Sequence, residues 1–287
     1  MLVIWESLEN IAEKGGDSIA EQINGRLLLC PFLYKRDNVR LFLYSSGYFE
    51  QIQSVQEQPR QNLILASLPK EDLRRLEPQM KEVLLPLNEV VISPEDPIQY
   101  VYFPQGALIS LVSLMEDGKS VEAGLIGLEG MAGLPVVLAD GTTPMRSVVQ
   151  IEGAAIQMRS GVVKEEFQRA GALQNALHRY MHALFVEFSQ SAACNRLHPI
   201  IGRLSRWLLM ASDAVASEKL FLTHDYLSVM LGIRRPGVTE AAVELRERGG
   251  IDYSRGEIRI VNRKVLEGIA CECYEFVKKE FDRMYTK

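Results

Sequence analysis

Short apolar runs separated by turn residues occupy residues 83–158, whereas longer helical spacings flank them. Runs such as VLLPL, YVYF and ALISLVSLM are interrupted by Pro, Gly and Asp, and Asp117–Gly118 is a strong hairpin signal. Strands at this spacing are typical of a small β-barrel or jelly roll. Upstream, the leucines between Asn62 and Leu76 predict short helices, with Pro69 as a first helical residue.

A helical period returns over residues 161–196. Five apolar positions with spacings of 4, 3, 4 and 4 residues form a seam: Leu173, Leu177, Tyr180, Leu184 and Phe188. A second apolar set widens the stripe: Ala176, Met181 and Phe185. We expect a long helix that packs on its own barrel and on the same helix of a second copy, which makes the protein a homodimer. The alternative is a helix buried within a monomer.

Residues 220–261 predict two helices joined by a tight turn and followed by a two-stranded wing. Thr223 is a candidate N-cap for the first helix, and Gly232 lies in the turn. Pro236 suits the first position of the second helix, which is expected to end near Arg248. Together these signals indicate a winged helix-turn-helix.

The net charge of −5 argues against a nucleic-acid partner until the distribution of charge is considered. Residues 196–264 carry 12 Lys and Arg against 8 Asp and Glu, a local balance of +4. The excess of basic residues therefore coincides with the predicted helix-turn-helix, as expected for binding double-stranded DNA.

The first turns of a recognition helix reach base edges in the major groove. We expect base contacts from Arg235, which can bond two guanine acceptors at once, and from Thr239 and Glu240. The expected phosphate contacts are Thr223, Arg234 and Arg255. The alternative is that the winged helix binds another protein rather than DNA.

The segments LGIRRPGVTEAAVELRERGGI (231–251) and CNRLHPIIGRLSRWLLMA (194–211) resemble the Crp/Fnr family, and the resemblance extends over residues 62–275. It implies a homodimer that reads a palindromic DNA site and contacts RNA polymerase. Arg235 falls on the arginine that reads guanine in the family. Pro236 and Glu240 depart from the best-known members, so a different target sequence is expected.

The predicted fold class is α+β, with four parts. Residues 1–60 are an N-terminal extension of unknown role, and residues 61–160 form a cyclic-nucleotide-binding-like β-barrel, or jelly-roll, sensor domain. Residues 161–196 form the long dimerisation helix, and residues 197–287 form the DNA-binding domain.

The resemblance also suggests a ligand site in the barrel, at Gly130, Gly133, Arg146 and Ser147. Arg146 and Ser147 stand where the family binds phosphate, and such donors beside a glycine-rich turn can hold an anion. The family's acidic partner is missing, with Ala132 or Gly133 in its place, so cyclic AMP binding is not expected. The alternatives are another ligand, or a surface or packing role for Arg146.

The sequence predicts no metal site and no catalytic residue, and it does not identify a cofactor. Cys30, Cys194, Cys271 and Cys273 are scattered, and Cys271 and Cys273 are expected on different faces of one helix. The pair His178 and His182 has metal-ligand spacing but no third ligand nearby. We therefore expect the cysteines to be ordinary thiols and the two histidines to lie on the helix surface or at an interface.

Two further classes of protein are disfavoured. A metal-dependent barrel enzyme needs histidines inside the barrel, and the first histidine is His178, after it. Apolar runs of about 20 residues and a basic signal segment are both lacking. We therefore expect a cytoplasmic protein that is neither an enzyme nor bound to a membrane.

Overall fold

The computed structural model describes residues 61–254 and 256–285 of the chain. The predicted N-terminal extension, residues 1–60, lies outside the described residues. So do Cys30 and Arg255, the latter a predicted phosphate contact.

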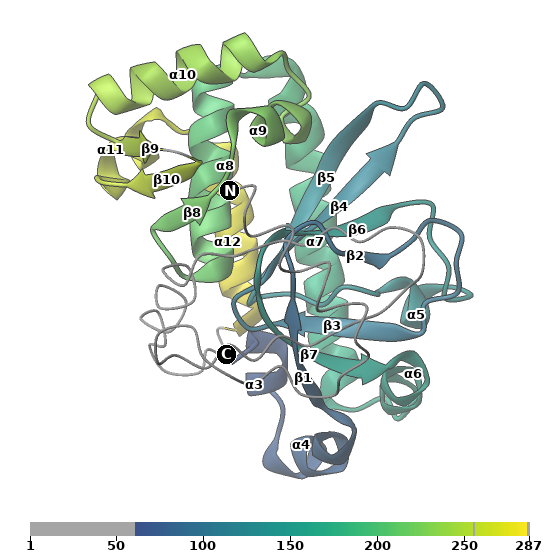
Figure 1. The fold of residues 1–287 in the computed structure, drawn as a ribbon. Helices are drawn as coiled ribbons and strands as arrows, with labels where there is room; N and C mark the ends of the chain where they lie inside the picture. Colours follow the sequence, from purple (N-terminus) through teal and green to yellow (C-terminus); the bar gives the residue numbers. More distant parts are fainter. Residues whose placement is uncertain (1–60, 255, 286–287) are drawn as a thin grey trace, which may run out of the picture. The chain divides into compact units, whose positions relative to one another are not determined.

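The predicted barrel consists of two antiparallel sheets (Figure 1), with strand orders β1-β7-β3 and β2-β6-β4-β5. The strands are β1 (Lys81–Leu85), β2 (Val90–Ile92), β3 (Tyr100–Pro104), β4 (Leu108–Leu114), β5 (Ser120–Ile126), β6 (Arg146–Ile151) and β7 (Gly153–Arg159). The predicted hairpin at Asp117–Gly118 joins β4 to β5, and Gly118 adopts the left-handed backbone (φ 81°) that the tight turn requires. The jelly-roll fold expected from the short apolar runs is therefore confirmed.

The facing sides of the two sheets bury one apolar core. Phe103 of β3 and Met158 of β7 come from one sheet, and Ile109 of β4 and Val149 of β6 come from the other; all are almost completely buried. Removal of this apolar surface from water is the main source of the stability of the barrel.

Short helices close the barrel: α3 (Leu63–Ala66), α4 (Lys70–Leu76), the 3-10 turn η1 (Glu77–Gln79), α5 (Pro135–Leu138) and α6 (Ser160–Gln168). The buried side chain of Asn62 caps α3 by accepting hydrogen bonds from the amides of Ile64 and Leu65, and it donates to the carbonyl of Gly130 at 2.8 Å. Pro69 is the N-cap of α4 rather than its first residue.

The long helix is α7 (Ala172–Leu197), which begins later than predicted. A break at Ala170, which has a positive φ of 58°, and Gly171 separates it from α6. The single helix predicted over residues 161–196 is therefore two helices. The break was not predicted, because the turn at Ala170 has no Pro or Gly at the turning residue itself.

The predicted dimer seam faces the barrel of its own chain. Leu173, Leu177, Tyr180 and Leu184 are buried in the barrel core, and Phe188 packs against it. Four of the five side chains are therefore buried within one chain, which leaves only the partly buried Phe188 of the predicted seam for a partner helix. Phe185, from the second apolar set, is instead 68% exposed.

The C-terminal part contains α8 (Ile200–Val215), β8 (Lys219–Phe221), α9 (His224–Met230), α10 (Arg235–Glu247), β9 (Ile251–Ser254), β10 (Glu257–Ile260), α11 (Arg263–Ile269) and α12 (Cys273–Tyr285). The wing has three strands in the order β8-β10-β9, not the two that were predicted. The strand β8 was missed because only three residues form it. In Figure 1, α12 returns along α7, which it contacts.

The core of the C-terminal part includes two side chains of the barrel, Leu108 of β4 and Leu125 of β5. The approach is close, because a Cβ on Gly127 would lie 2.4 Å from the Cβ of Ala214 in α8. The amide of Leu128 also donates to the carbonyl of Ala214 at 2.9 Å. The barrel and the helix-turn-helix therefore share a wall.

Among the helices of residues 61–254 and 256–285, none has the length and apolar character needed to cross a membrane.

Candidate nucleic-acid interface

The helix-turn-helix is set by local signals in the sequence. The Thr223 side chain accepts a hydrogen bond from the amide of Tyr226 at 3.2 Å and so caps α9, as predicted. Gly232 turns the chain with a φ of 61°, and Arg234 is the N-cap of α10, with Pro236 in its first turn. The recognition helix therefore starts with its unpaired backbone N–H groups beside two arginines.

The side chains of Arg234 and Arg235 are exposed at the start of α10. The Nε atom of Arg235 lies 3.0 Å from Oδ1 of Asp225 in α9, and both side chains are mostly exposed. Arg234 has no ion-pair partner within the described part of the chain. Positive charge thus concentrates at a helix N-terminus, where the helix dipole also favours an anion.

Thr239 and Glu240 lie one turn along α10. The Thr239 hydroxyl donates to the carbonyl of Arg235 at 3.2 Å and lies 3.2 Å from Nδ1 of His224. Glu240 is exposed. His224 was not among the predicted site residues, although it directly follows the cap residue Thr223 and lies beside Thr239 of α10.

The wing is fixed to the far end of α10. The guanidinium of Arg246 lies 5.2 Å from the ring centroid of Tyr253 on β9 and pairs with Asp252, with 3.2 Å between Nε and Oδ1. The His224 ring also lies 5.2 Å from Tyr253. Tyr253 therefore links the start of α9, the recognition helix and the wing.

Two of the basic residues in the positive segment do not reach the surface. Arg203 and Arg206 of α8 are 8% and 6% exposed. Arg203 donates to the carbonyl of Leu231 and to Oδ1 of Asn195, and Arg206 donates to the Ser191 hydroxyl. These two arginines therefore stabilise the fold and do not contribute to the charge of the surface. The exposed arginines at the start of α10, Arg234 and Arg235, provide the positive charge of the interface.

Residues 202–269 match the family model described as a Crp-like helix-turn-helix domain. No curated protein matches the chain.

The C-terminal part of the chain is thus similar to the helix-turn-helix domains of Crp-like proteins.

Solved structures of transcriptional regulators have a similar fold. A Crp/Fnr-family regulator from Eubacterium rectale is 13% identical and has a TM-score of 0.55, with 72% of this chain and 96% of that chain covered. FixK2 from Bradyrhizobium japonicum is 14% identical, with a TM-score of 0.54 and coverage of 67% and 98%. The c-di-GMP responsive regulator CLP from Xanthomonas campestris is 13% identical, with a TM-score of 0.52 and coverage of 68% and 100%.

The four predicted ligand residues of the barrel have different environments. Gly130 and Gly133 are required by packing, since a Cβ would lie 2.5 Å from the hydroxyl oxygen of Tyr180 and 2.8 Å from Cγ1 of Val101, respectively. Ser147 is buried in the middle of its sheet. Close packing thus explains why glycine occupies these two positions, and no ligand is needed to explain it.

Arg146 differs from the other three predicted ligand residues. Its Nε atom is buried and has no hydrogen-bond partner within residues 61–254 and 256–285. Leaving a buried donor of a charged group without a partner costs free energy, so this atom is the one position in the predicted set that favours a bound anion.

A cavity of about 420 Å³ lies where the shared wall meets α12, and none of the four predicted ligand residues lines it. Residues from β5, α8 and α12 line it, including Leu125, Asp213 and Phe281. Glu129 and Glu187 are acidic members of the lining, and burial raises the pKa of both, for Glu187 to about 8. No local sequence pattern predicts this cavity, because its lining comes from segments far apart in the chain.

Proposed function

We propose that this regulator binds double-stranded DNA sequence-specifically as a homodimer on a palindromic site, with α10 in the major groove. The supporting observation is the exposed pair Arg234 and Arg235 at the N-terminus of α10. Helix N–H groups, the helix dipole and two guanidinium groups there all face the same region, which suits the phosphates and base edges of DNA.

The proposed contacts follow from the orientation of α10. Arg235 bonds to guanine and Glu240 accepts from a cytosine amino group. Because the Thr239 hydroxyl is engaged by the Arg235 carbonyl and lies beside His224, its methyl group is the part that contacts a base, most suitably thymine. Thr223, Arg234 and Arg255 contact phosphates and set the position of the helix.

A homodimer presents two copies of α10 to two half-sites. Since the predicted seam is buried against the barrel, we propose that the exposed face of α7 forms the interface. Phe185 is its central side chain, with the small, exposed residues Ser189 and Ala192 one and two turns further on. The dimer acts in the cytoplasm and contacts RNA polymerase at the promoter.

The direct test uses the full-length protein. Bound sequences are selected from random duplexes, and the affinity for the selected site is then measured by gel shift between about 50 and 200 mM salt. We expect an inverted repeat and a steep fall of affinity with salt, because two half-sites release several counterions. Failure to enrich any sequence, together with salt-insensitive binding, would instead support a wing that binds protein.

We also propose that an anionic ligand in the barrel controls DNA binding through Arg146. The unpartnered Nε atom of Arg146 supports this. The absent acidic partner makes cyclic AMP a poor candidate, so the thermal shift of the protein is measured with cyclic mononucleotides, cyclic dinucleotides and inorganic phosphate. A shift that Arg146→Gln abolishes supports the proposal, and an equal shift in both proteins contradicts it.

A further inference from the structure

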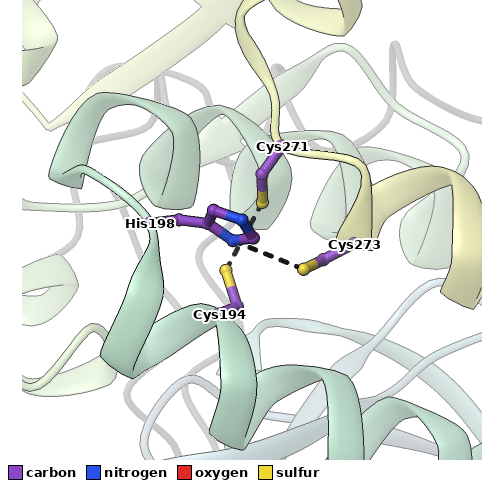
Figure 2. A group of neighbouring side chains, drawn as sticks. All are labelled: Cys194, His198, Cys271 and Cys273. Carbon is purple, nitrogen blue, oxygen red and sulfur yellow. Dashed lines mark hydrogen bonds between the residues drawn. The ribbon is translucent and has the colours of Figure 1, made fainter.

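Three cysteines and a histidine from distant parts of the chain meet at the end of α7 (Figure 2). Cys194 and His198 lie one helical turn apart, with His198 as the C-cap of α7. Cys271 lies in the link between α11 and α12, and Cys273 is the first residue of α12. The cysteines are scattered along the sequence, and Cys271 and Cys273 were expected on different faces of one helix. The second expectation is wrong, because Cys271 precedes α12.

The donor atoms of these four side chains point towards a common centre in Figure 2, and all lie within 4.8 Å of one another. The Sγ atoms of Cys194 and Cys271 are 3.4 Å apart, and Sγ of Cys273 is 3.5 Å from Nδ1 of His198. With zinc–ligand bonds of about 2.3 Å to sulfur and about 2.0 Å to nitrogen, a tetrahedral site places two sulfurs about 3.8 Å apart and sulfur and nitrogen about 3.5 Å apart. The cluster is therefore close to the dimensions of one tetrahedral site.

The donor set selects the kind of metal. Thiolate and imidazole ligands suit zinc, whereas calcium and magnesium require oxygen ligands. An iron–sulfur cluster spreads its thiolates over several iron atoms, and the donors here are compact enough for only one ion. Three cysteines and one histidine are a known ligand set of structural zinc sites.

The His198 ring is oriented for this role by a neighbouring carboxylate. Its Nε2 atom lies 3.4 Å from Oε1 of Glu272, and Nδ1 faces the sulfurs. A proton on Nε2, facing Glu272, leaves the lone pair of Nδ1 free to bind a metal. Metal-bound histidines commonly have such a carboxylate on the other nitrogen.

We propose that Cys194, His198, Cys271 and Cys273 bind one zinc ion. The ion joins the C-terminal end of the long helix α7 to the link between α11 and α12. It thereby fixes the point at which the chain leaves the helix of the sensor part and enters the DNA-binding part at Ile200. This site is separate from the DNA interface and from Arg146.

The first test measures metal in the full-length protein, purified under reducing conditions without chelators. We expect about one zinc ion per chain by elemental analysis. After replacement of zinc by Co²⁺, we expect the charge-transfer absorption of thiolate-bound cobalt and the strong visible bands of tetrahedral coordination. Iron with the absorption of an iron–sulfur cluster, a disulfide between Cys194 and Cys271 under these conditions, or protein that gives no thiolate–cobalt absorption would overturn the proposal.

The second test uses a residue outside the ligand set, so that folding is preserved. Glu272 is largely exposed, and Glu272→Ala removes the partner of His198 Nε2. We expect zinc affinity, measured by competition with a chromophoric chelator, to fall by about tenfold. Glu275→Ala, which removes an exposed carboxylate three residues further on, in the first turn of α12, is the matched control and should leave the affinity unchanged.

The ligand variants complete the test. Cys273→Ser should weaken zinc binding strongly, whereas Cys30→Ser should not, since four ligands already complete a tetrahedral site. Equal zinc content in wild type and in Cys273→Ser would contradict the proposal. If Cys273→Ser does not fold, the cobalt spectrum of the wild type and the comparison of Glu272→Ala with Glu275→Ala decide the question.

Discussion

The indole Nε1 of Trp207 donates a hydrogen bond of 2.6 Å to Oε1 of Glu122, across the wall that the barrel and the DNA-binding part share. Trp207 belongs to α8 and Glu122 to β5, and both side chains are buried. The other carboxylate oxygen accepts from the Ser110 hydroxyl. A buried polar contact of this kind is stable only while both of its partners are present.

Trp207→Phe is expected to destabilise the protein by about 1–3 kcal/mol, because it leaves a buried oxygen of Glu122 without its donor. Urea unfolding followed by circular dichroism measures the effect. In the Glu122→Gln background the same substitution should cost less, since an amide oxygen without a partner is less unfavourable than a carboxylate. Equal costs in the two backgrounds would show that the effect comes from lost ring volume alone.

The buried carboxyls predict that stability declines as pH rises. Burial raises the pKa of Glu122 from its ordinary value of 4.5 to about 7, and that of Glu187 to about 8. Both folded-state pKa values lie above the unfolded value. Their contribution is therefore fully present below about pH 4.5, and it is lost as pH rises through 7 for Glu122 and 8 for Glu187.

The free energy of unfolding, measured from pH 5 to pH 8.5, checks this sign. For Glu122 the decline is on the order of 3 kcal/mol, from the size of the pKa shift. Glu122→Gln should flatten the profile below pH 7, because the amide does not titrate. A profile in the variant as steep as in the wild type would assign the decline to other groups.

Arg235→Ala is expected to reduce affinity for the selected DNA site by about 1–3 kcal/mol per half-site and to relax the preference for guanine at one position. Arg234→Ala should instead weaken binding to all sequences and lower the salt slope by about one per half-site. Arg248→Ala, at the other end of α10, is the matched control. Gel shifts with the selected and a scrambled duplex distinguish the three, and an unchanged preference in Arg235→Ala would remove its role in reading a base.

The ion pair between Arg235 and Asp225 competes with DNA for the same guanidinium. Because the pair is exposed, it is worth at most about 1 kcal/mol. Asp225→Asn should therefore raise DNA affinity severalfold, most clearly at low salt. Weaker binding by this variant would mean that Asp225 orients Arg235 for its contact rather than restraining it.

Substitutions on the two faces of α7 are expected to have different effects. Phe185→Glu should dissociate the dimer and leave the fold intact, because this side chain is 68% exposed. Leu177→Glu should unfold the barrel, since it buries a charge in the core at a cost of several kcal/mol. Light scattering and circular dichroism measure the two results, and a Phe185→Glu dimer would place the interface elsewhere.

Local patterns predicted the elements of this fold well. The strand spacing of the barrel and the succession of Thr223, Gly232 and Pro236 are readable because each signal acts within a few residues. The helical stripe of Leu177 was correctly assigned to a buried face but to the wrong partner, since a periodic pattern does not identify the surface that covers it. Contacts such as Glu122 with Trp207 and Cys194 with Cys271 join residues 85 and 77 positions apart, which no local pattern records.

The shared wall defines what can be exchanged between regulators of this architecture. Leu108 and Leu125 belong to strands of the barrel, yet they complete the core of the helix-turn-helix part. A chimaera that joined residues 197–287 to a foreign barrel would therefore expose that core to water unless the new barrel supplied matching side chains. The unit that can be recombined is the helix-turn-helix together with the β4–β5 hairpin. A helix-turn-helix transferred to another barrel therefore has to bring these two strands of its own barrel with it.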